Sequence, residues 1–182
     1  MDPKVPIAAF VLVAVVALPA IVMDDPDMDT LRLQAEAGDP EALFRYGVCL
    51  MQGRGVDRDD RRAVALWTEA AIAGHAASAA ALGGTLGART DDEASREEGQ
   101  YWTLRAADLG HPDAMLTLSS RALERGDLVE AAFWVRAADR GNGRWTDRAV
   151  SLEARLDAEG RREVDRRYGE WIASHQAVSL MD

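Results

Sequence analysis

The sequence predicts an all-α protein, an α-solenoid of antiparallel helix hairpins with one N-terminal transmembrane helix. Three observations lead to this fold class. From Thr30 onward the chain of 182 residues is rich in Ala, Leu, Arg and Glu and has few β-branched runs, which is the composition of a helical domain. An Ala-Ala pair followed by a glycine recurs along this part. A long uncharged stretch precedes it.

Residues 1–24 are predicted to form a membrane anchor. The stretch from Val5 to Met23 carries no charged side chain, and at about 1.5 Å per helical residue it is roughly 28 Å long, near the thickness of a bilayer core. Its large apolar side chains are Ile7, Phe10, Leu12, Val16, Leu18 and Ile21. A cleaved signal peptide is the alternative. That reading needs small residues at the third and first positions before the cut, and an end at Ala20 places a leucine at the third.

The charges on either side of this stretch predict its orientation. Lys4 precedes it, and an acidic linker, residues 25–30, follows it. By the positive-inside rule the N-terminus is then cytoplasmic. In a bacterium the chain would be a single-pass protein of the inner membrane, with its solenoid domain in the periplasm.

The strongest signal in the chain is an internal repeat between residues 31 and 143. Each copy has an Ala-Ala pair, a glycine four positions after the first alanine, and a tryptophan shortly before the pair. The copies comprise Trp67, Ala70, Ala71 and Gly74; Trp102, Ala106, Ala107 and Gly110; and Trp134, Ala137, Ala138 and Gly141. The glycines are 36 and 31 residues apart, and each interval has room for two helices.

Residue size explains how such a copy would fold. The alanines let two helices approach closely while the tryptophan ring fills the space beside them, and the glycine takes the left-handed conformation that ends a helix. Pro40 and Pro112 each come two residues after a glycine, Gly38 and Gly110, and suit the first turn of the next helix, where a missing N–H costs nothing. Each hairpin has an apolar face that it cannot cover alone, so the hairpins are expected to stack into a solenoid.

The segment from Glu41 to His75, EALFRYGVCLMQGRGVDRDDRRAVALWTEAAIAGH, resembles a Sel-one-like repeat, a relative of the tetratricopeptide repeat. The residues at that family's spacing are Ala42, Tyr46, Gly47, Leu50, Gly53, Gly55, Val56, Asp59, Ala63, Trp67, Ala70, Ala71 and Gly74. The second copy keeps Leu82, Gly83 and Leu86 but lacks the glycine turn, and the third is shorter by about five residues. The resemblance implies about three repeats, a tetratricopeptide-like solenoid and a role in protein–protein assembly.

Residues 144–176 are predicted to form a pair of capping helices. Their apolar faces consist of Ala149, Leu152 and Leu156 in the first helix and of Val164, Tyr168, Trp171 and Ile172 in the second. Arginines and glutamates lie opposite these faces, so the outer surface of the cap should be polar. Residues 177–182 are predicted to be a flexible tail.

The sequence contains no set of residues typical of catalysis, and we expect neither an enzyme nor a cofactor. The GRGV turn at Gly53 and Gly55 has the glycines of a phosphate loop, but aspartates follow where that loop has Lys-Ser or Lys-Thr. His75 and His111 both follow a helix-ending glycine, about one repeat apart, which is too far to share a metal ion. The single cysteine, Cys49, allows no internal disulfide. The net charge of −10 disfavours a nucleic-acid surface.

Three apolar side chains do not belong to the repeat pattern. Phe44, Val48 and Met51 fall at i, i+4 and i+7 and share one face of the first helix of the best copy. They either pack against a preceding helical segment that carries Leu31 and Leu33, or form a docking strip for a partner close to the membrane. The docking strip is the candidate binding site that the sequence offers.

The resemblance favours a non-enzymatic, membrane-anchored scaffold or adaptor that mediates protein–protein interaction at the periplasmic face. The expected partners are proteins, a membrane protein among them, with no metal and no nucleic acid. An accessory single-span subunit of a larger respiratory or photosynthetic membrane complex is the alternative, because small residues in the anchor would allow close helix packing. An exported hydrolase is a third, more remote alternative.

Overall fold

The computed structural model describes residues 27–88, 92–140 and 143–178. All regular secondary structure in these ranges is helical, which confirms the predicted all-α class. The helices are α1 (Met28–Glu36), α2 (Pro40–Gln52), α3 (Asp60–Ile72), α4 (Ala76–Gly87), α5 (Glu93–Asp108), α6 (Pro112–Glu124), α7 (Leu128–Asp139), α8 (Thr146–Glu153) and α9 (Ala158–Val178). The predicted anchor lies outside the described ranges, and no helix inside them is long and apolar enough to span a bilayer.

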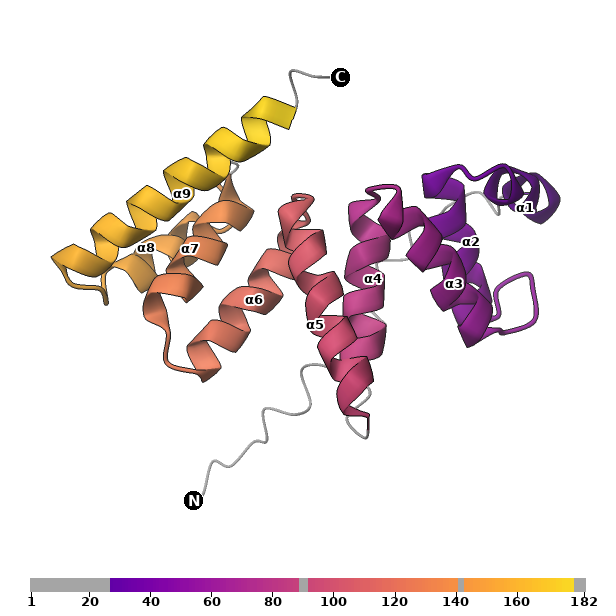
Figure 1. Ribbon diagram of the computed structural model, residues 1–182, viewed down its shortest axis with the longest axis horizontal. Helices are drawn as coiled ribbons and strands as arrows, with labels where there is room; N and C mark the ends of the chain where they lie inside the picture. The colour runs from indigo at the N-terminus through magenta and orange to yellow at the C-terminus, as the bar shows by residue number, and fades with distance from the viewer. Residues whose placement is uncertain (1–26, 89–91, 141–142, 179–182) are drawn as a thin grey trace. The chain divides into compact units, whose positions relative to one another are not determined.

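The chain forms two compact units, Met1–Leu66 and Trp67–Asp182, and α3 contributes residues to both. The first unit contains α1 and α2, which pack on each other. In the second unit α4 packs on α5 and α6 packs on α7, while α8 and α9 both pack on α7 (Figure 1). After the last residues of α3, the second unit therefore contains two helix hairpins, the arrangement that the repeat predicts, followed by two further helices.

The first unit is organised around α2. Asp39 caps the start of this helix by accepting a hydrogen bond of 2.7 Å from the backbone of Ala42. Gly53 follows the last turn with a φ of +65°, a conformation that favours glycine. The loop then returns so that Asp59 N donates to Leu50 O over 3.0 Å. The GRGV segment is thus a turn between two helices.

Glycines also close helices in the second unit, through one repeated arrangement. At the end of α3, Gly74 has a φ of +90°, and His75 N donates to Ala70 O over 2.9 Å. The same arrangement, with Gly110 at +86°, follows α5. The first alanine of each pair therefore accepts the hydrogen bond that finishes its helix. The paired alanines are nearly fully buried: Ala70, Ala71, Ala106, Ala107, Ala137 and Ala138 expose at most 2 %.

The close approach of α4 and α5 depends on glycines in both helices. A Cβ on Gly83 would lie 2.9 Å from the backbone nitrogen of Thr103, and one on Gly99 would lie 2.7 Å from the Cα of Gly87. Thr103 Oγ1 donates to Gly99 O over 2.7 Å, which satisfies this buried hydroxyl within its own helix. The two backbones therefore pack directly against each other.

Trp102 is one position out of register with the other two tryptophans. Trp67 and Trp134 lie three residues before their alanine pairs, whereas Trp102 lies four residues before its own. Counted from the pair, Thr103 takes the position of the missing tryptophan, and it is the residue that contacts Gly83. A tryptophan there would not fit between backbones this close. In this copy, direct contact between Thr103 and Gly83 therefore takes the place of the tryptophan ring that the sequence pattern predicts between the helices.

α8 and α9 lie in the range predicted for the cap and share a core with α7. Ala149 and Leu152 of α8 and Val164 of α9 are buried in a cluster with Ala131 and Val135 of α7. Each of the two helices thus covers apolar surface on α7.

The C-terminal part of α9 contacts two helix ends elsewhere in the second unit. The guanidinium of Arg140, just after α7, lies over the ring of Trp171 with its carbon 5.2 Å from the ring centroid. His175 Nε2 forms a hydrogen bond of 2.6 Å with the carbonyl oxygen of Asp108 at the end of α5. The structure thus gives His175, which has no partner in the sequence pattern, a contact far away in the chain.

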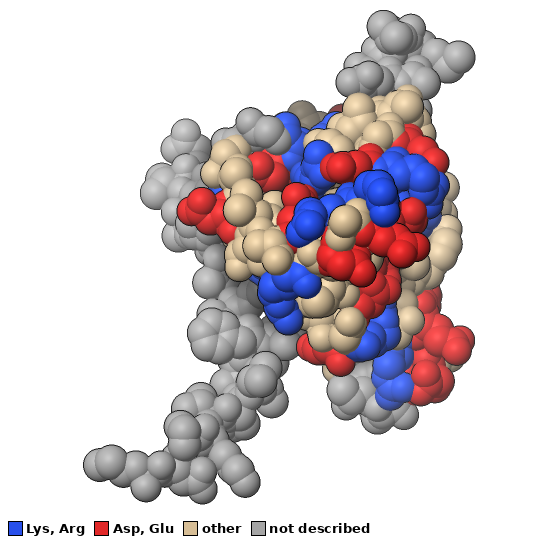
Figure 2. All heavy atoms as spheres, turned by 90° about the vertical axis from the view of Figure 1, so that its left-hand side faces the viewer, with Lys and Arg blue, Asp and Glu red and all other residues tan. Residues whose placement is uncertain are grey.

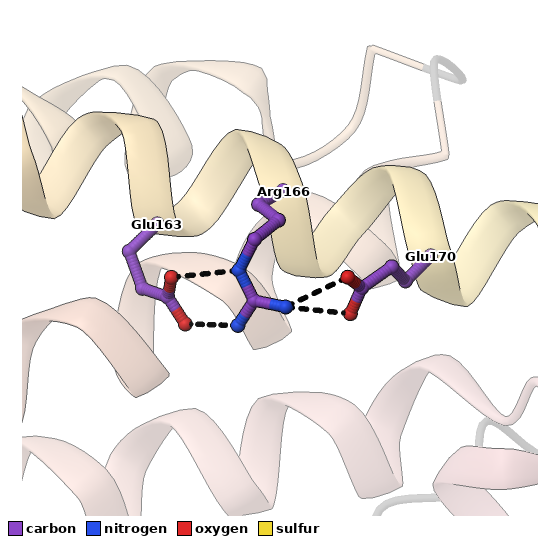
Figure 3. A network of polar contacts seen from close by, with 3 residues as sticks. All are labelled: Glu163, Arg166 and Glu170. Atoms are coloured by element: carbon purple, nitrogen blue, oxygen red, sulfur yellow. Dashed lines mark hydrogen bonds and ion pairs between the residues drawn. The ribbon is translucent and has the colours of Figure 1, made fainter.

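The outer face of the cap is polar. Basic and acidic side chains are interspersed over the face shown in Figure 2. On α9, Arg166 binds both carboxylate oxygens of Glu163 (2.6 and 2.9 Å) and of Glu170 (2.7 and 2.9 Å), as Figure 3 shows. The hydrogen bond from Arg166 lowers the pKa of Glu163. One arginine therefore binds two carboxylates along the exposed face of α9.

Two predicted boundaries differ from those of the structure. α1 begins at Met28, so the last three residues of the predicted acidic linker are helical. Asp27 caps this helix by accepting a hydrogen bond of 3.2 Å from the backbone nitrogen of Asp29, a role that the surrounding aspartates conceal in the sequence. At the other end, α9 extends to Val178 and includes the first two residues of the predicted tail.

The stop after α7 also differs from the prediction. The left-handed residue that ends this helix is Arg140, with a φ of +42°, whereas the sequence pattern assigns the stop to Gly141. Gly141 itself lies outside the described ranges.

Candidate functional site

An open groove of about 400 Å³ lies between α5, α6 and α7 of the second unit. Its lining consists of Gln100 and Leu104 from α5, Leu118, Arg121, Glu124 and Arg125 from α6 and its end, and Glu130 from α7. The groove therefore combines apolar side chains with charges of both signs. We describe it as the α5–α7 groove.

The apolar part of the groove is exposed on α5. Leu104 exposes 45 % of its surface, and Tyr101, one helical turn earlier, exposes 54 %. Residues three apart share a helix face, so the two side chains form one apolar strip beside the groove. Leu118 of α6 is buried. A ligand that covers the strip would remove apolar surface from water, which is favourable.

The charged side chains of the groove differ in how they are satisfied. Arg125 forms an ion pair of 3.0 Å with Glu130, and Trp134 Nε1 also donates to Glu130 over 3.3 Å. Arg121 is half-buried, and its side chain makes no hydrogen bond or ion pair with any residue in the described part of the chain. Burial lowers the pKa of the Arg121 guanidinium, and the charge of nearby Glu124 partly opposes this effect.

The predicted docking strip lies in the first unit, away from this groove in the chain. Phe44, Val48 and Met51 are all half-buried on α2. Of the two leucines proposed to cover them, Leu31 of α1 is buried and Leu33 is 61 % exposed. Packing of α1 on α2 thus involves Leu31 and not Leu33. Partner binding at the strip stays a prediction.

The two histidines that follow helix-ending glycines differ in their contacts. Nδ1 of His75 accepts a hydrogen bond of 3.3 Å from Ser78 N and lies 2.9 Å from Ser78 Oγ, so this residue caps α4. His111 occupies the same place before α6 but makes no side-chain cap bond, and its Nδ1 is buried without a partner. Ala114 stands where Ser78 stands in the preceding copy and has no hydroxyl to hold the ring. Within the described residues no cluster of three or more metal-binding side chains occurs.

The unfolding free energy of the second unit is expected to fall as the pH drops below about 6.5. Burial lowers the pKa of His111, nearby Asp113 opposes the shift and His75 adds to it, so the unfolded chain takes up the proton first. Serine caps a helix well and does not titrate, so His111→Ser should raise the unfolding free energy by about 1 kcal/mol. Thermal unfolding at about pH 7.5 and about pH 5 would show a larger advantage of the variant at the lower pH. An equal advantage at both would contradict this explanation.

The repeat pattern alone does not predict the α5–α7 groove, although the chain contains a signal for it. Counted from the alanine pairs, Tyr101 and Leu104 stand where the first copy has Ala65 and Thr68. Large apolar residues thus replace smaller ones at two positions on one helix face. Arg121 has no comparable signal, because a missing partner is visible only when the neighbouring helices are in place.

Comparison with known proteins identifies the repeats. The Sel1 repeat model matches residues 40–75 and 76–111. The groove begins in the second matched repeat and continues into α6 and α7, the hairpin of the predicted third copy, which lies beyond the matched range. A comparison with curated proteins gives no match.

Two solved structures are similar to this chain. A Sel1 repeat protein from Oxalobacter formigenes is 29 % identical, with 69 % of this chain and 98 % of that chain covered and a TM-score of 0.58. A protective antigen of uropathogenic Escherichia coli with an SLR fold is 22 % identical, with 80 % of this chain and 40 % of that chain covered and a TM-score of 0.53. The second similarity concerns the fold alone. The repeats predicted between residues 40 and 111 are therefore Sel1 repeats, and the chain contains two of them in this range.

Proposed function

We propose that this chain is a non-enzymatic scaffold that holds a protein partner in the α5–α7 groove. Sel1-repeat proteins generally mediate protein–protein interaction, and the exposed pair Tyr101 and Leu104 is the observation that supports this groove. An apolar strip bordered by charged side chains is typical of a protein-binding surface.

We further propose that the scaffold is tethered to a bacterial inner membrane and works on the periplasmic side. The uncharged stretch from Val5 to Met23 and the charges around it support this location. The tether would keep the groove near membrane-associated partners. Recovery of a chain that lacks residues 1–20 from its native host would contradict the anchor.

The groove can be tested by comparing two matched variants of the full-length tagged chain, extracted from its native host in mild detergent. Leu104→Glu places a charge on the apolar strip, whereas Val150→Glu changes a side chain on α8 that is 60 % exposed and does not line the groove. We expect a stoichiometric partner that the wild type and Val150→Glu retain and that Leu104→Glu loses. Equal capture by both variants would contradict a role for the groove, whereas a multi-span membrane complex that is independent of Leu104 would favour the accessory-subunit alternative.

A further inference from the structure

We infer that the partner segment held in the α5–α7 groove carries an aspartate or glutamate side chain that pairs with Arg121, next to an apolar side chain that covers Leu104. This inference rests on the proposed function and adds the chemistry of the partner. It follows from the groove's charges, its neighbours and its apolar border.

The first step is the state of Arg121. Other half-buried arginines of the second unit have partners: Arg136 pairs with Asp165 over 2.5 Å and with Glu153 over 3.7 Å, and Arg167 lies over the ring of Phe133. Arg121 has no such contact within the described residues. The Arg121 guanidinium is only partly removed from water, and a bound carboxylate would supply the charge-assisted hydrogen bonds that the described side chains around it do not.

The second step is that neither glutamate of the groove forms an ion pair with Arg121. Glu130 is already engaged by Arg125 and Trp134. Glu124 is exposed and contributes charge to Arg121, but no ion pair between the two forms.

The guanidinium of Arg121 also lies close to the end of the neighbouring helix α4. A Cβ on Gly87 would lie 3.5 Å from Nη2 of Arg121. Because Gly87 has no side chain, it offers neither a partner nor an obstacle at this end of the guanidinium.

The third step concerns which anion fits. A guanidinium presents two parallel N–H donors that match the two oxygens of a carboxylate. The groove already contains Glu124 and Glu130, whose charges would repel a doubly charged phosphate more than a singly charged carboxylate. The groove therefore favours a carboxylate over a phosphorylated side chain.

The fourth step is the apolar neighbour. Leu104 and Arg121 line the same groove from α5 and α6, and Tyr101 extends the apolar surface along α5. A segment that places its carboxylate at Arg121 would bring adjacent residues over Leu104. We therefore expect Leu, Ile or Phe beside the acidic residue.

The test uses a display library of random peptides panned against the full-length chain in detergent micelles. We expect enriched peptides with Asp or Glu next to a large apolar residue. A synthetic peptide from this set should bind Arg121→Gln at least about tenfold more weakly than the wild type, because a charge-assisted pair is lost. Arg148→Gln is the matched control and should stay within about threefold of the wild type, because that arginine is exposed on α8 and does not line the groove.

A double-mutant cycle isolates the pair. Replacing the peptide's acidic residue by its amide should weaken binding to the wild type and leave binding to Arg121→Gln nearly unchanged. Peptides that lack acids and bind Arg121→Gln normally, yet lose binding to Leu104→Glu, would overturn this inference and leave the proposed function standing. Failure to obtain any peptide whose binding depends on Leu104 would count against both.

A stability measurement provides an independent readout. If the Arg121 guanidinium has no partner in the free chain, Arg121→Gln should not lower the thermal unfolding midpoint. A clearly lower midpoint would show that the folded chain itself satisfies this side chain and would overturn the inference.

Discussion

Gly99→Ala is expected to lower the unfolding free energy of the second unit by about 3 kcal/mol, because a new methyl group would overlap backbone atoms that cannot move independently. The added Cβ would lie 2.7 Å from the Cα of Gly87 and closer still to its nitrogen. Relief would require α4 and α5 to separate along their contact, which would also disturb Gly83 and Thr103. Urea denaturation followed by circular dichroism would measure the loss.

Gly84→Ala is the matched control for this prediction. Gly84 lies in the same helix as Gly87, is exposed, and has nothing within 4 Å of an added Cβ. Alanine should therefore stabilise α4 by about 0.5–1 kcal/mol. If Gly99→Ala were as stable as Gly84→Ala, the close backbone packing of α4 and α5 would be wrong.

Asp139→Ala is expected to lower the unfolding free energy by about 2–3 kcal/mol. This buried carboxylate accepts a hydrogen bond of 2.7 Å from Trp145 N and another of 2.7 Å from Thr146 Oγ1, so a residue of α7 holds the start of α8. Alanine would leave these donors without their acceptor. Hydrogen exchange should show faster exchange in α8 than elsewhere in the unit, and Asp139→Asn, which keeps one acceptor oxygen, should fall in between.

An ordinary cap at an exposed site provides the comparison. Asp127 caps α7 by accepting a hydrogen bond of 2.9 Å from Glu130 N and is exposed, so Asp127→Ala should cost about 1 kcal/mol. An Asp139→Ala variant that loses no more than this would mean that burial adds nothing to the contact between α7 and α8.

The helices and their turns could be predicted because they depend on short-range chemistry. Gly74 and Gly110 end their helices at the predicted positions, since the left-handed conformation and the hydrogen bonds that follow are properties of a few adjacent residues. The paired alanines are buried for a similar reason, because they recur on the same face of every copy. Such features can be read along the chain without knowledge of the neighbouring helix.

The α5–α7 groove could not be predicted in this way. Whether Leu104 is exposed depends on which helices cover α5, and whether Arg121 has a partner depends on side chains from three helices. The cap of α8 by Asp139 could not be predicted either, because a carboxylate in one helix accepts a hydrogen bond from the start of another. The sequence pattern led instead to Phe44, Val48 and Met51, because a helical spacing of apolar residues is visible without any tertiary information.

The hydrogen bond between His175 and the carbonyl of Asp108 has a consequence for how the second unit unfolds. In an array where each repeat touches only its neighbours, repeats can open one at a time from an end. Here the last helix returns to the end of α5, while its earlier turns pack on α7. Fraying of α9 from the C-terminus would therefore release contacts at two separate hairpins together. This couples the loss of the last helix to the hairpins on both sides of the groove, so the unit should melt in a single cooperative transition.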